Sequence, residues 1–315
     1  MKINNIKKLV FIAVVVLFSS CSELKNITEE QYKKIVYALS YDNSNVYEAI
    51  HNLSQSIDTG YVSVCVSGTK HITEDISVTF VEDREAFDRY NVLNFDLDTS
   101  KYAVLLDKKF YTIPSLSVTV PKEDNIDNGL LPIIIKPDGL SPDSTYFISL
   151  KITDASGYEI NEKRQSVLYR IYIENAYAQQ KESTTYFMKG ERKRETDSEP
   201  IPISSSKRVF PISGSAIRTY VDTYGHQNNL TRINGFSMIV NINDDRTIDF
   251  SPYKPELIQI EKIDDEKSNY YYEEKDARGD LQKRIKLHYR YRIINTETNE
   301  WSGWTEMVEN LKRQN

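Results

Sequence analysis

The sequence predicts an all-β protein: a β-sandwich with one short helix, followed by a second antiparallel β-domain that is a meander or barrel-like. Apolar and polar residues alternate in segments that recur every roughly a dozen residues, as strands of antiparallel sheets do. The 22 Tyr residues, against 2 Trp and 4 Met, suit a pleated, half-buried surface. A length of 315 residues with 39% apolar composition is enough for about two domains that each bury a core.

The N-terminus carries an export signal. Lysines precede ten unbroken apolar residues at 9–18, and a helix of that length spans only about 15 Å, half of a bilayer core. Small residues then lead to Cys21, which resembles the lipobox of bacterial lipoproteins, although Phe18 replaces the usual Leu or Val. We expect a lipoprotein signal peptide at 1–20, an acylated Cys21 that anchors the chain in a membrane, and a polar tether at 21–30. The alternative is an ordinary secretory signal with a chance Cys.

The first domain is expected at 31–178. Residues 31–39 fit either a capped helix or a strand, and their β-prone Ile, Val and Tyr favour the strand. Residues 61–67 and 76–82 alternate with period two and are separated by polar residues typical of a hairpin, whereas 82–93 predicts a helix with acids at its start. The helix would bury Ala86, Phe87 and Tyr90. Further strands are predicted at 110–120, 130–136, 145–153 and 166–174.

The second domain is expected at 182–315, after a polar break. Residues 190–208 are charged and then rich in Pro and Ser, which predicts a long loop. Strands are predicted at 208–214, 235–242, 246–253, 257–263, 269–275, 284–294 and 305–311. The strand at 284–294 is two-faced. Leu287, Tyr289, Tyr291 and Ile293 line one face, and His288, Arg290 and Arg292 line the other.

The chain has two cysteines. If Cys21 is acylated, no second cysteine remains to form a disulfide with Cys65, and its position within an alternating strand predicts a lone buried thiol.

The order of these segments resembles a known group of proteins. The lipobox, the early strand QYKKIVYAL, the unit DISVTFVEDREAFDRYN and the element LSPDSTYFISLKI resemble the N-terminal immunoglobulin-like domain of surface lipoproteins from Bacteroides-type glycan-foraging bacteria. The same domain precedes some surface endo-β-N-acetylglucosaminidases. The C-terminal part, ending RIKLHYRYRIINTETNEWSGWTEMVENLKR, is similar to the β-rich domain of unknown function in two-domain members. The resemblance implies an outer-membrane lipoprotein, displayed on the cell surface and associated with outer-membrane glycan-uptake proteins. One departure is that Cys21 is not followed by an acidic run, which leaves the choice of leaflet open.

No catalytic pattern is present. The related endoglycosidases carry Asp-x-x-Asp-x-Asp-x-Glu, but here Leu93 stands at the first Asp position and Ser100 at the position of the Glu that acts as general acid. The four His are scattered and the zinc-peptidase, nucleophile-elbow and phosphate-loop patterns are absent. Acidic stretches at 243–245 and 264–266 fit either calcium ligands or hairpin turns, and turns are favoured. We therefore expect no enzyme, no cofactor and no metal site, and a net charge of -6 disfavours nucleic acid as a partner.

Aromatic side chains are the remaining candidates for ligand binding, because a flat ring can stack on the apolar face of a sugar. The candidates are Trp301 and Trp304, Tyr270 and Tyr272, and Tyr220 and Tyr224 in a polar loop. For each of them, ordinary packing within a Tyr-rich β-protein is the favoured alternative. In a regular strand, residues three apart face opposite ways, so we expect one Trp in the core and the other near its rim. A bulge at Gly303 would instead place both Trp side chains on one face.

The sequence thus favours a non-catalytic surface lipoprotein that binds a glycan or assists polysaccharide utilisation. A fimbrial or adhesive subunit, which assembles by donating a strand to a neighbour's sheet, is the alternative. A hydrolase of unrecognised type ranks third.

Overall fold

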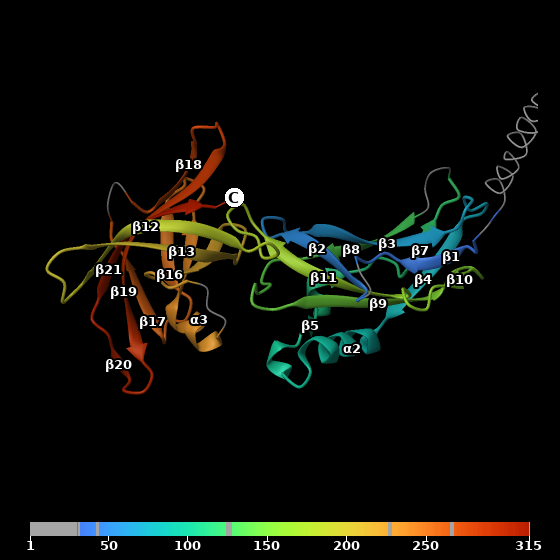
Figure 1. The fold of residues 1–315 in the computed structure, drawn as a ribbon, viewed down its shortest axis with the longest axis horizontal. Helices are drawn as coiled ribbons and strands as arrows, with labels where there is room; N and C mark the ends of the chain where they lie inside the picture. The colour runs from blue at the N-terminus through green and yellow to red at the C-terminus, as the bar shows by residue number, and fades with distance from the viewer. Residues whose placement is uncertain are drawn as a thin grey trace, which may run out of the picture.

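A computed structural model of the chain describes residues 30, 32–41, 44–123, 128–225, 229–264 and 268–314. The predicted signal peptide and Cys21 lie outside this part. Within it, no helix is long and apolar enough to cross a membrane. Figure 1 shows two β-rich domains arranged end to end along the longest axis of the molecule. The predicted all-β fold class is confirmed.

The N-terminal domain is an immunoglobulin-like sandwich of two sheets, as predicted. One sheet has the order β10-β1-β3-β8-β6, and the other has the order β2-β11-β9-β4-β7 with β5 beside β9. The strands are β1 (Ile35–Ala38), β2 (Val46–Asn52), β3 (Asp58–Ser67), β4 (Ile76–Glu82), β5 (Val104–Leu105), β6 (Tyr111–Thr112), β7 (Ser117–Val120), β8 (Asn128–Ile135), β9 (Tyr146–Asp154), β10 (Glu159–Ile160) and β11 (Ser166–Glu174). Two short 3-10 helices, η2 (Thr99–Lys101) and η3 (Lys108–Phe110), lie in the connections.

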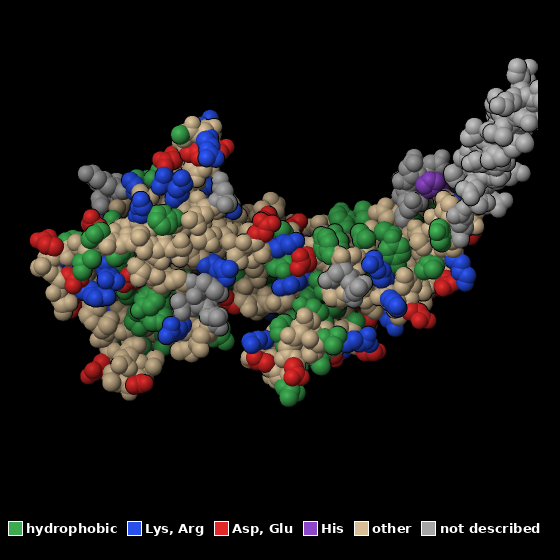
Figure 2. Space-filling view, viewed as in Figure 1, with side chains coloured by type: hydrophobic (Ala, Val, Ile, Leu, Met, Phe, Trp, Pro, Cys, Tyr) green, Lys and Arg blue, Asp and Glu red, His purple; other side chains and the backbone are tan. Residues whose placement is uncertain are grey.

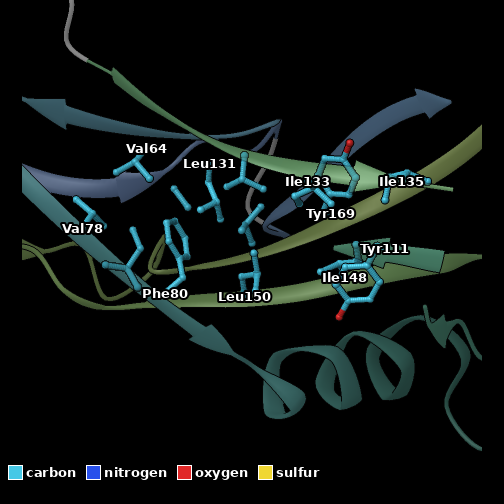
Figure 3. Close-up of a cluster of buried hydrophobic side chains, with 14 of the residues drawn as sticks. Val64, Val78, Phe80, Tyr111, Leu131, Ile133, Ile135, Ile148, Leu150 and Tyr169 are labelled. Carbon is cyan, nitrogen blue, oxygen red and sulfur yellow. The ribbon is translucent and has the colours of Figure 1, made fainter. Parts of the chain in front are cut away.

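The core of this domain lies between the two sheets. Figure 3 shows Val64 and Leu131 from one sheet facing Phe80 and Leu150 from the other, and all four are at most 1% exposed. These residues alternate with outward-facing ones along their strands, so the period-two pattern places them in the core. Their burial removes apolar surface from water, which is the main force that holds the sheets together.

Helix α2 (Arg84–Phe95) packs on the outer face of the second sheet, over β9 and β11, and confirms the predicted helix. The Asp83 side chain accepts a hydrogen bond from the Ala86 amide and caps the helix N-terminus. Phe87 is buried against Phe147 of β9, with ring centroids 6.3 Å apart.

Three features of the first domain differ from the prediction. The strand predicted at 110–120 is divided into β6 and β7, which belong to different sheets. The strands β3 and β4 do not form a hairpin, because they belong to different sheets and the polar segment between them crosses the sandwich. Cys65 is half-buried rather than buried, because it lies on the outward face of β3. The predicted strand at 31–39 is confirmed as β1, whose inward Val36 and Ala38 are fully buried.

The C-terminal domain is a single sheet that curves into a nearly closed, barrel-like form. Its order is β16-β15-β14-β13-β12-β21-β19-β17, and β18 and β20 also pair with β19. The elements are β12 (Thr184–Arg194), β13 (Ile201–Pro211), β14 (Ala216–Tyr220), α3 (Leu230–Phe236), β15 (Ser237–Ile242), β16 (Ile248–Pro252), β17 (Ile258–Lys262), β18 (Tyr270–Lys275), β19 (Leu281–Asn295), β20 (Glu300–Trp301) and β21 (Thr305–Arg313). The ends of the sheet meet where Lys262 of β17 pairs with Asp249 of β16 at 3.1 Å.

The predicted loop at 190–208 is wrong. These residues belong to β12 and β13, which form a long hairpin. The interpretation failed because charged residues dominate 191–194 and one of them, Arg192, occupies an inward position, while the apolar inward residues that identify the strand, Tyr186 and Met188, come earlier. The sequence analysis also did not predict α3.

The acidic stretch at 243–245 forms the turn between β15 and β16, as favoured. The Asp245 carboxylate accepts hydrogen bonds from the Thr247 amide and hydroxyl, and Asn243 donates to Asp249 at 3.0 Å. These bonds occupy the oxygens within the turn itself. Of the second acidic stretch, residues 265–266 lie outside the described residues.

Specific contacts join the two domains. Both guanidinium nitrogens Nη1 and Nη2 of Arg218 in β14 bind the Asp143 carboxylate of the N-terminal domain, the Nη2 bond at 2.7 Å. The Arg218 side chain is fully buried. The Asn175 amide group donates to the Ser213 carbonyl at 2.7 Å and to the Ala216 carbonyl at 2.9 Å. A bidentate ion pair and these amide bonds fix one domain against the other more specifically than apolar contact alone.

Candidate functional site

The cleft

A cleft of about 680 Å³ lies at one end of the barrel-like sheet. It forms where β12, β14 and β19 end and where β21 begins, with the last residue of α3 at its side. Four aromatic and several charged residues line it: Tyr224, Phe236, Tyr291, Trp304, Arg194, Glu195 and Asp222. A concave site with aromatic walls and a few fixed polar groups has the general composition of a small-ligand site.

Asp222 is held in place at the base of the cleft. Its carboxylate oxygens both lie 3.3 Å from Arg192 Nη1, and Oδ2 accepts a hydrogen bond from the Tyr291 hydroxyl at 2.8 Å. The residue has φ of 52°, a left-handed conformation that Asp tolerates better than most residues. Burial and the neighbouring carboxylate raise the pKa of Tyr291, so its hydroxyl keeps the proton that it donates.

Tyr224 and Phe236 form one aromatic wall. Their ring centroids are 4.1 Å apart, with an angle of 30° between the planes. Tyr224 follows β14, and Phe236 ends α3, so the helix that the sequence analysis did not predict supplies half of the wall.

The two tryptophans

Trp301 and Trp304 lie on the same face of the sheet, contrary to the expectation of opposite faces. Ile294 of β19 pairs with Trp301, and Tyr291 pairs with Thr305, so three steps along β19 (294 − 291) correspond to four along its partner (305 − 301). One extra residue therefore lies between β20 and β21, which is the bulge that the sequence left open at Gly303.

Neither tryptophan is in the core. Both are half-buried, and the Arg292 guanidinium lies over both rings, 5.3 Å from the Trp301 centroid and 4.7 Å from that of Trp304. A Cβ atom at Gly303 would lie 2.6 Å from the Glu195 carboxylate, so a larger residue at 303 would displace that side chain. With glycine there, Glu195 accepts a hydrogen bond from the Trp304 amide at 2.9 Å. The predicted core Trp is thus wrong, because the bulge turns both rings outward.

The other candidates

The remaining aromatic candidates separate into two places. Tyr220 lies at the end of β14, not in a loop, and is fully buried, so it offers no surface to a ligand in this structure. Tyr270 and Tyr272 lie together on the outer face of β18, with ring centroids 5.4 Å apart, whereas Tyr271 points inward. That alternation was predicted and is confirmed. The pair lies apart from the cleft. In the β18–β19 pairing, Tyr270 is directly opposite Lys286 of β19.

Several cleft residues were missed from sequence. Arg194 and Glu195 were assigned to the long loop, and Phe236 was assigned to a strand. The alternation of inward residues in β12 was the signal that would have placed Arg194 at a strand end beside the cleft.

A buried charged network lies behind the cleft. The Tyr289 hydroxyl accepts a hydrogen bond from the Asp222 amide at 3.3 Å and donates one to Glu309 at 2.6 Å. Both Glu309 oxygens lie 2.6 Å from Lys207 Nζ, and neither side chain is exposed. Burial lowers the pKa of Lys207 and raises the pKa of Glu309, while their pairing opposes both shifts. The network connects the base of the cleft to the barrel interior.

The cleft brings aromatic, carboxylate and guanidinium groups together. Within the described ranges, no group of three or more His, Cys, Asp or Glu side chains is suited to a metal ion. A second cleft, between α2 and β11, is lined by charged and amide side chains and carries no aromatic ring among its lining residues.

Comparison with known proteins

Family models match both domains of the chain. One, described as an N-terminal domain, matches residues 31–159, and the other, described as C-terminal, matches residues 165–312. Between them they cover most of the chain. No curated protein matches the sequence.

Solved structures from Bacteroides share the two-domain fold. A protein of unknown function from Bacteroides ovatus is 14% identical, with a TM-score of 0.63, and the match covers 89% of this chain and 94% of that one. A multidomain protein from the same organism that includes DUF1735 is 15% identical, with a TM-score of 0.62 and coverage of 90% and 94%. An auxiliary nutrient binding protein from Bacteroides thetaiotaomicron is 15% identical, with a TM-score of 0.60 and coverage of 87% and 92%. At these identities the likeness concerns the fold alone.

Proposed function

The chain belongs to the two-domain family whose N-terminal and C-terminal models match it, and we propose that it is a non-catalytic lipoprotein that binds a glycan and assists polysaccharide utilisation. The observation that carries the proposal is the cleft, in which Trp304, Tyr224 and Phe236 converge with Asp222 and Glu195. The similar fold of the Bacteroides thetaiotaomicron auxiliary nutrient binding protein supports a role in nutrient capture.

Sugar binding in this cleft has a direct physical basis. The apolar face of a pyranose ring packs on an aromatic ring, which removes apolar surface from water. Its hydroxyl groups donate to carboxylates such as Asp222, and hydrogen bonds to charged groups are stronger than neutral ones. Because Arg192 and Tyr291 already hold Asp222, binding costs little additional ordering of that side chain.

The N-terminal sequence supports a lipid anchor at the outer membrane. In this proposal the partner is the glycan-uptake machinery of that membrane. Acylation of Cys21 would hold the two domains at the membrane surface through a short tether. Changing Cys21 to Ser in the producing cell should move the protein from the membrane fraction to the soluble fraction. Retention of the variant in the membrane would contradict acylation of this residue.

A glycan array probed with the purified protein tests the binding role. We expect binding to a limited set of glycans, and we expect Trp304→Ala and Tyr224→Ala each to weaken it by roughly tenfold or more, since truncating a central aromatic residue of a site often costs above 1 kcal/mol. Tyr32→Ala is the matched control, because this aromatic ring is 71% exposed in the other domain. Silence of the folded protein across plant and host glycans would contradict the proposal, as would equal effects of all three substitutions.

A further inference from the structure

The outward face of β19 carries a line of basic side chains. Because side chains alternate along a strand, Arg284, Lys286, His288, Arg290 and Arg292 all point away from the core, while Ile285, Leu287 and Tyr289 are buried. Figure 2 shows Lys and Arg side chains gathered on the surface beside β18, which pairs with the first part of this strand. The line stands out on a chain whose net charge is -6.

Two of these basic side chains, Lys286 and Arg292, differ from the others in their partners. Arg284, His288 and Arg290 each pair with a glutamate on a neighbouring strand, at 2.5 Å, 2.8 Å and 2.5 Å respectively. In the part of the chain that the structure describes, Lys286 and Arg292 have no carboxylate oxygen within 4.0 Å. Their charges are therefore not neutralised by a direct ion pair.

Each of these two cations lies over a pair of aromatic rings. Lys286 Nζ is 5.4 Å from the Tyr270 ring centroid and 5.7 Å from that of Tyr272. Arg292 is placed in the same way over the two tryptophans described above. Hydrogen bonding with the Tyr270 hydroxyl raises the pKa of Lys286, so its ammonium remains charged at neutral pH.

The two units, each a cation with its pair of aromatic rings, have a fixed separation. Lys286 and Arg292 are six positions apart on one strand, which corresponds to about 20 Å at the usual rise of a β-strand. The strand between them is paired on both sides, with β17 and β21 as neighbours, so the spacing is rigid. Each unit offers an aromatic surface for a sugar ring and a cation for an acidic substituent of that sugar.

We propose that the outward face of β19 binds an anionic polysaccharide, with Lys286 and Arg292 as charge anchors and the Tyr and Trp pairs as stacking surfaces. This inference rests on the proposed glycan-binding function and names its substrate class. The chain would pass from the cleft, where Trp304 lies, along β19 to Tyr270 on β18. Because three glutamates already pair with the other basic side chains, only Lys286 and Arg292 remain as counter-charges, which suits a uronic acid polymer with one charge per sugar better than a densely charged polyphosphate.

The test compares two forms of one polymer. Polygalacturonate carries a carboxylate on every sugar, and full methyl esterification removes the charge without changing the backbone. We expect the purified full chain to bind polygalacturonate in affinity electrophoresis and calorimetry and to bind the methyl ester at least tenfold more weakly. Binding of polygalacturonate should also weaken as salt rises, because ions screen exposed charges.

Substitutions locate the anchors. Lys286→Ala and Arg292→Ala should each weaken polygalacturonate binding about tenfold, and the double variant about a hundredfold, since sites this far apart act almost independently. Lys286→Arg should restore most of the binding. Lys33→Ala is the matched control, because Lys33 is an exposed cation of the N-terminal domain, and it should bind as the unsubstituted protein does. Circular dichroism checks that each variant is folded.

The possible outcomes distinguish this inference from the function on which it rests. Binding of neutral glycans that is lost in Tyr224→Ala, with no binding of polygalacturonate, alginate or chondroitin sulfate, overturns the inference and leaves the cleft function standing. Silence towards every glycan overturns both. Equal affinity for both forms of the polymer, or for a single-stranded oligonucleotide of similar length, also overturns the assignment to an anionic polysaccharide.

Discussion

Removing one partner of the buried pair Lys207–Glu309 should destabilise the C-terminal domain strongly. Lys207 Nζ contacts both oxygens of Glu309 at 2.6 Å and donates to the Tyr220 carbonyl at 2.8 Å, with no exposure to water. In Lys207→Met, the carboxylate keeps the Tyr289 hydroxyl as a partner but loses its counter-charge. Breaking a buried pair from one side typically costs 3–5 kcal/mol, so we expect the free energy of unfolding to fall by about 4 kcal/mol.

The loss of stability in Lys207→Met should depend on pH. Burial raises the pKa of Glu309 in the folded state above its ordinary value of about 4.5. A carboxyl group with a raised folded pKa contributes its full stability below the unfolded pKa and loses it as the pH rises through the folded pKa. Without Lys207 to oppose this shift, the variant should be weakened more at pH 8 than at pH 5. Replacing both residues, as in Lys207→Met with Glu309→Leu, should recover at least half of the loss, because no unpaired charge remains.

Urea unfolding followed by tryptophan fluorescence measures this effect. Both tryptophans lie in the C-terminal domain, so their emission reports that domain. The unfolding midpoint should fall in the single variant while the slope with urea stays unchanged. A single variant within 1 kcal/mol of the unsubstituted protein, or a double variant as unstable as the single one, would refute the reasoning.

Three further predictions concern stability. Burial lowers the pKa of His51 in the folded state. The contribution of the neutral imidazole to folding stability is therefore present above a pH of about 6.5 and is lost as the pH falls through the folded pKa. His51→Gln should flatten this part of the stability profile in thermal melts. Gly190→Ala should cost about 3 kcal/mol or more in urea unfolding, because its Cβ would lie 1.9 Å from a backbone oxygen, whereas Gly235→Ala, with nothing within 4 Å, should change stability by less than about 1 kcal/mol. Asp143→Asn should weaken the contact with Arg218, and calorimetry should then resolve two unfolding transitions that lie further apart than in the unsubstituted protein.

Strand periodicity was sufficient for much of the fold. The alternation in 284–294 predicted which side of β19 is buried, and Leu287, Tyr289 and Tyr291 are at most 7% exposed. Such patterns are readable because a half-buried strand must direct every second side chain to the core. The same reasoning failed for β12, where charged residues dominate the composition of 191–194 and even the inward position 192 is an arginine.

The site was less predictable than the fold because it depends on register. The spacing of Trp301 and Trp304 indicates opposite faces, and only the pairing of both segments with β19 shows the extra residue that reverses this. A glycine at 303 is compatible with a bulge but does not require one, since glycine also occurs in open turns. Register is a tertiary property, so the joint placement of both tryptophans beside Arg292 could not be derived from local sequence.

The position of the buried network explains why a binding site at this end of the sheet can be rigid. Loops at strand ends are the most mobile parts of β-domains, and a ligand that must first order them binds more weakly. Here the base of the cleft is attached to strands on three sides: Asp222 contacts Arg192 of β12 and Tyr291 of β19, and its amide contacts Tyr289, which in turn binds Glu309 of β21. Satisfied buried polar groups of this kind favour one arrangement over alternatives, because any displacement leaves a charge without a partner. The buried charged network therefore holds the base of the cleft in one geometry, whereas apolar packing would permit small rearrangements.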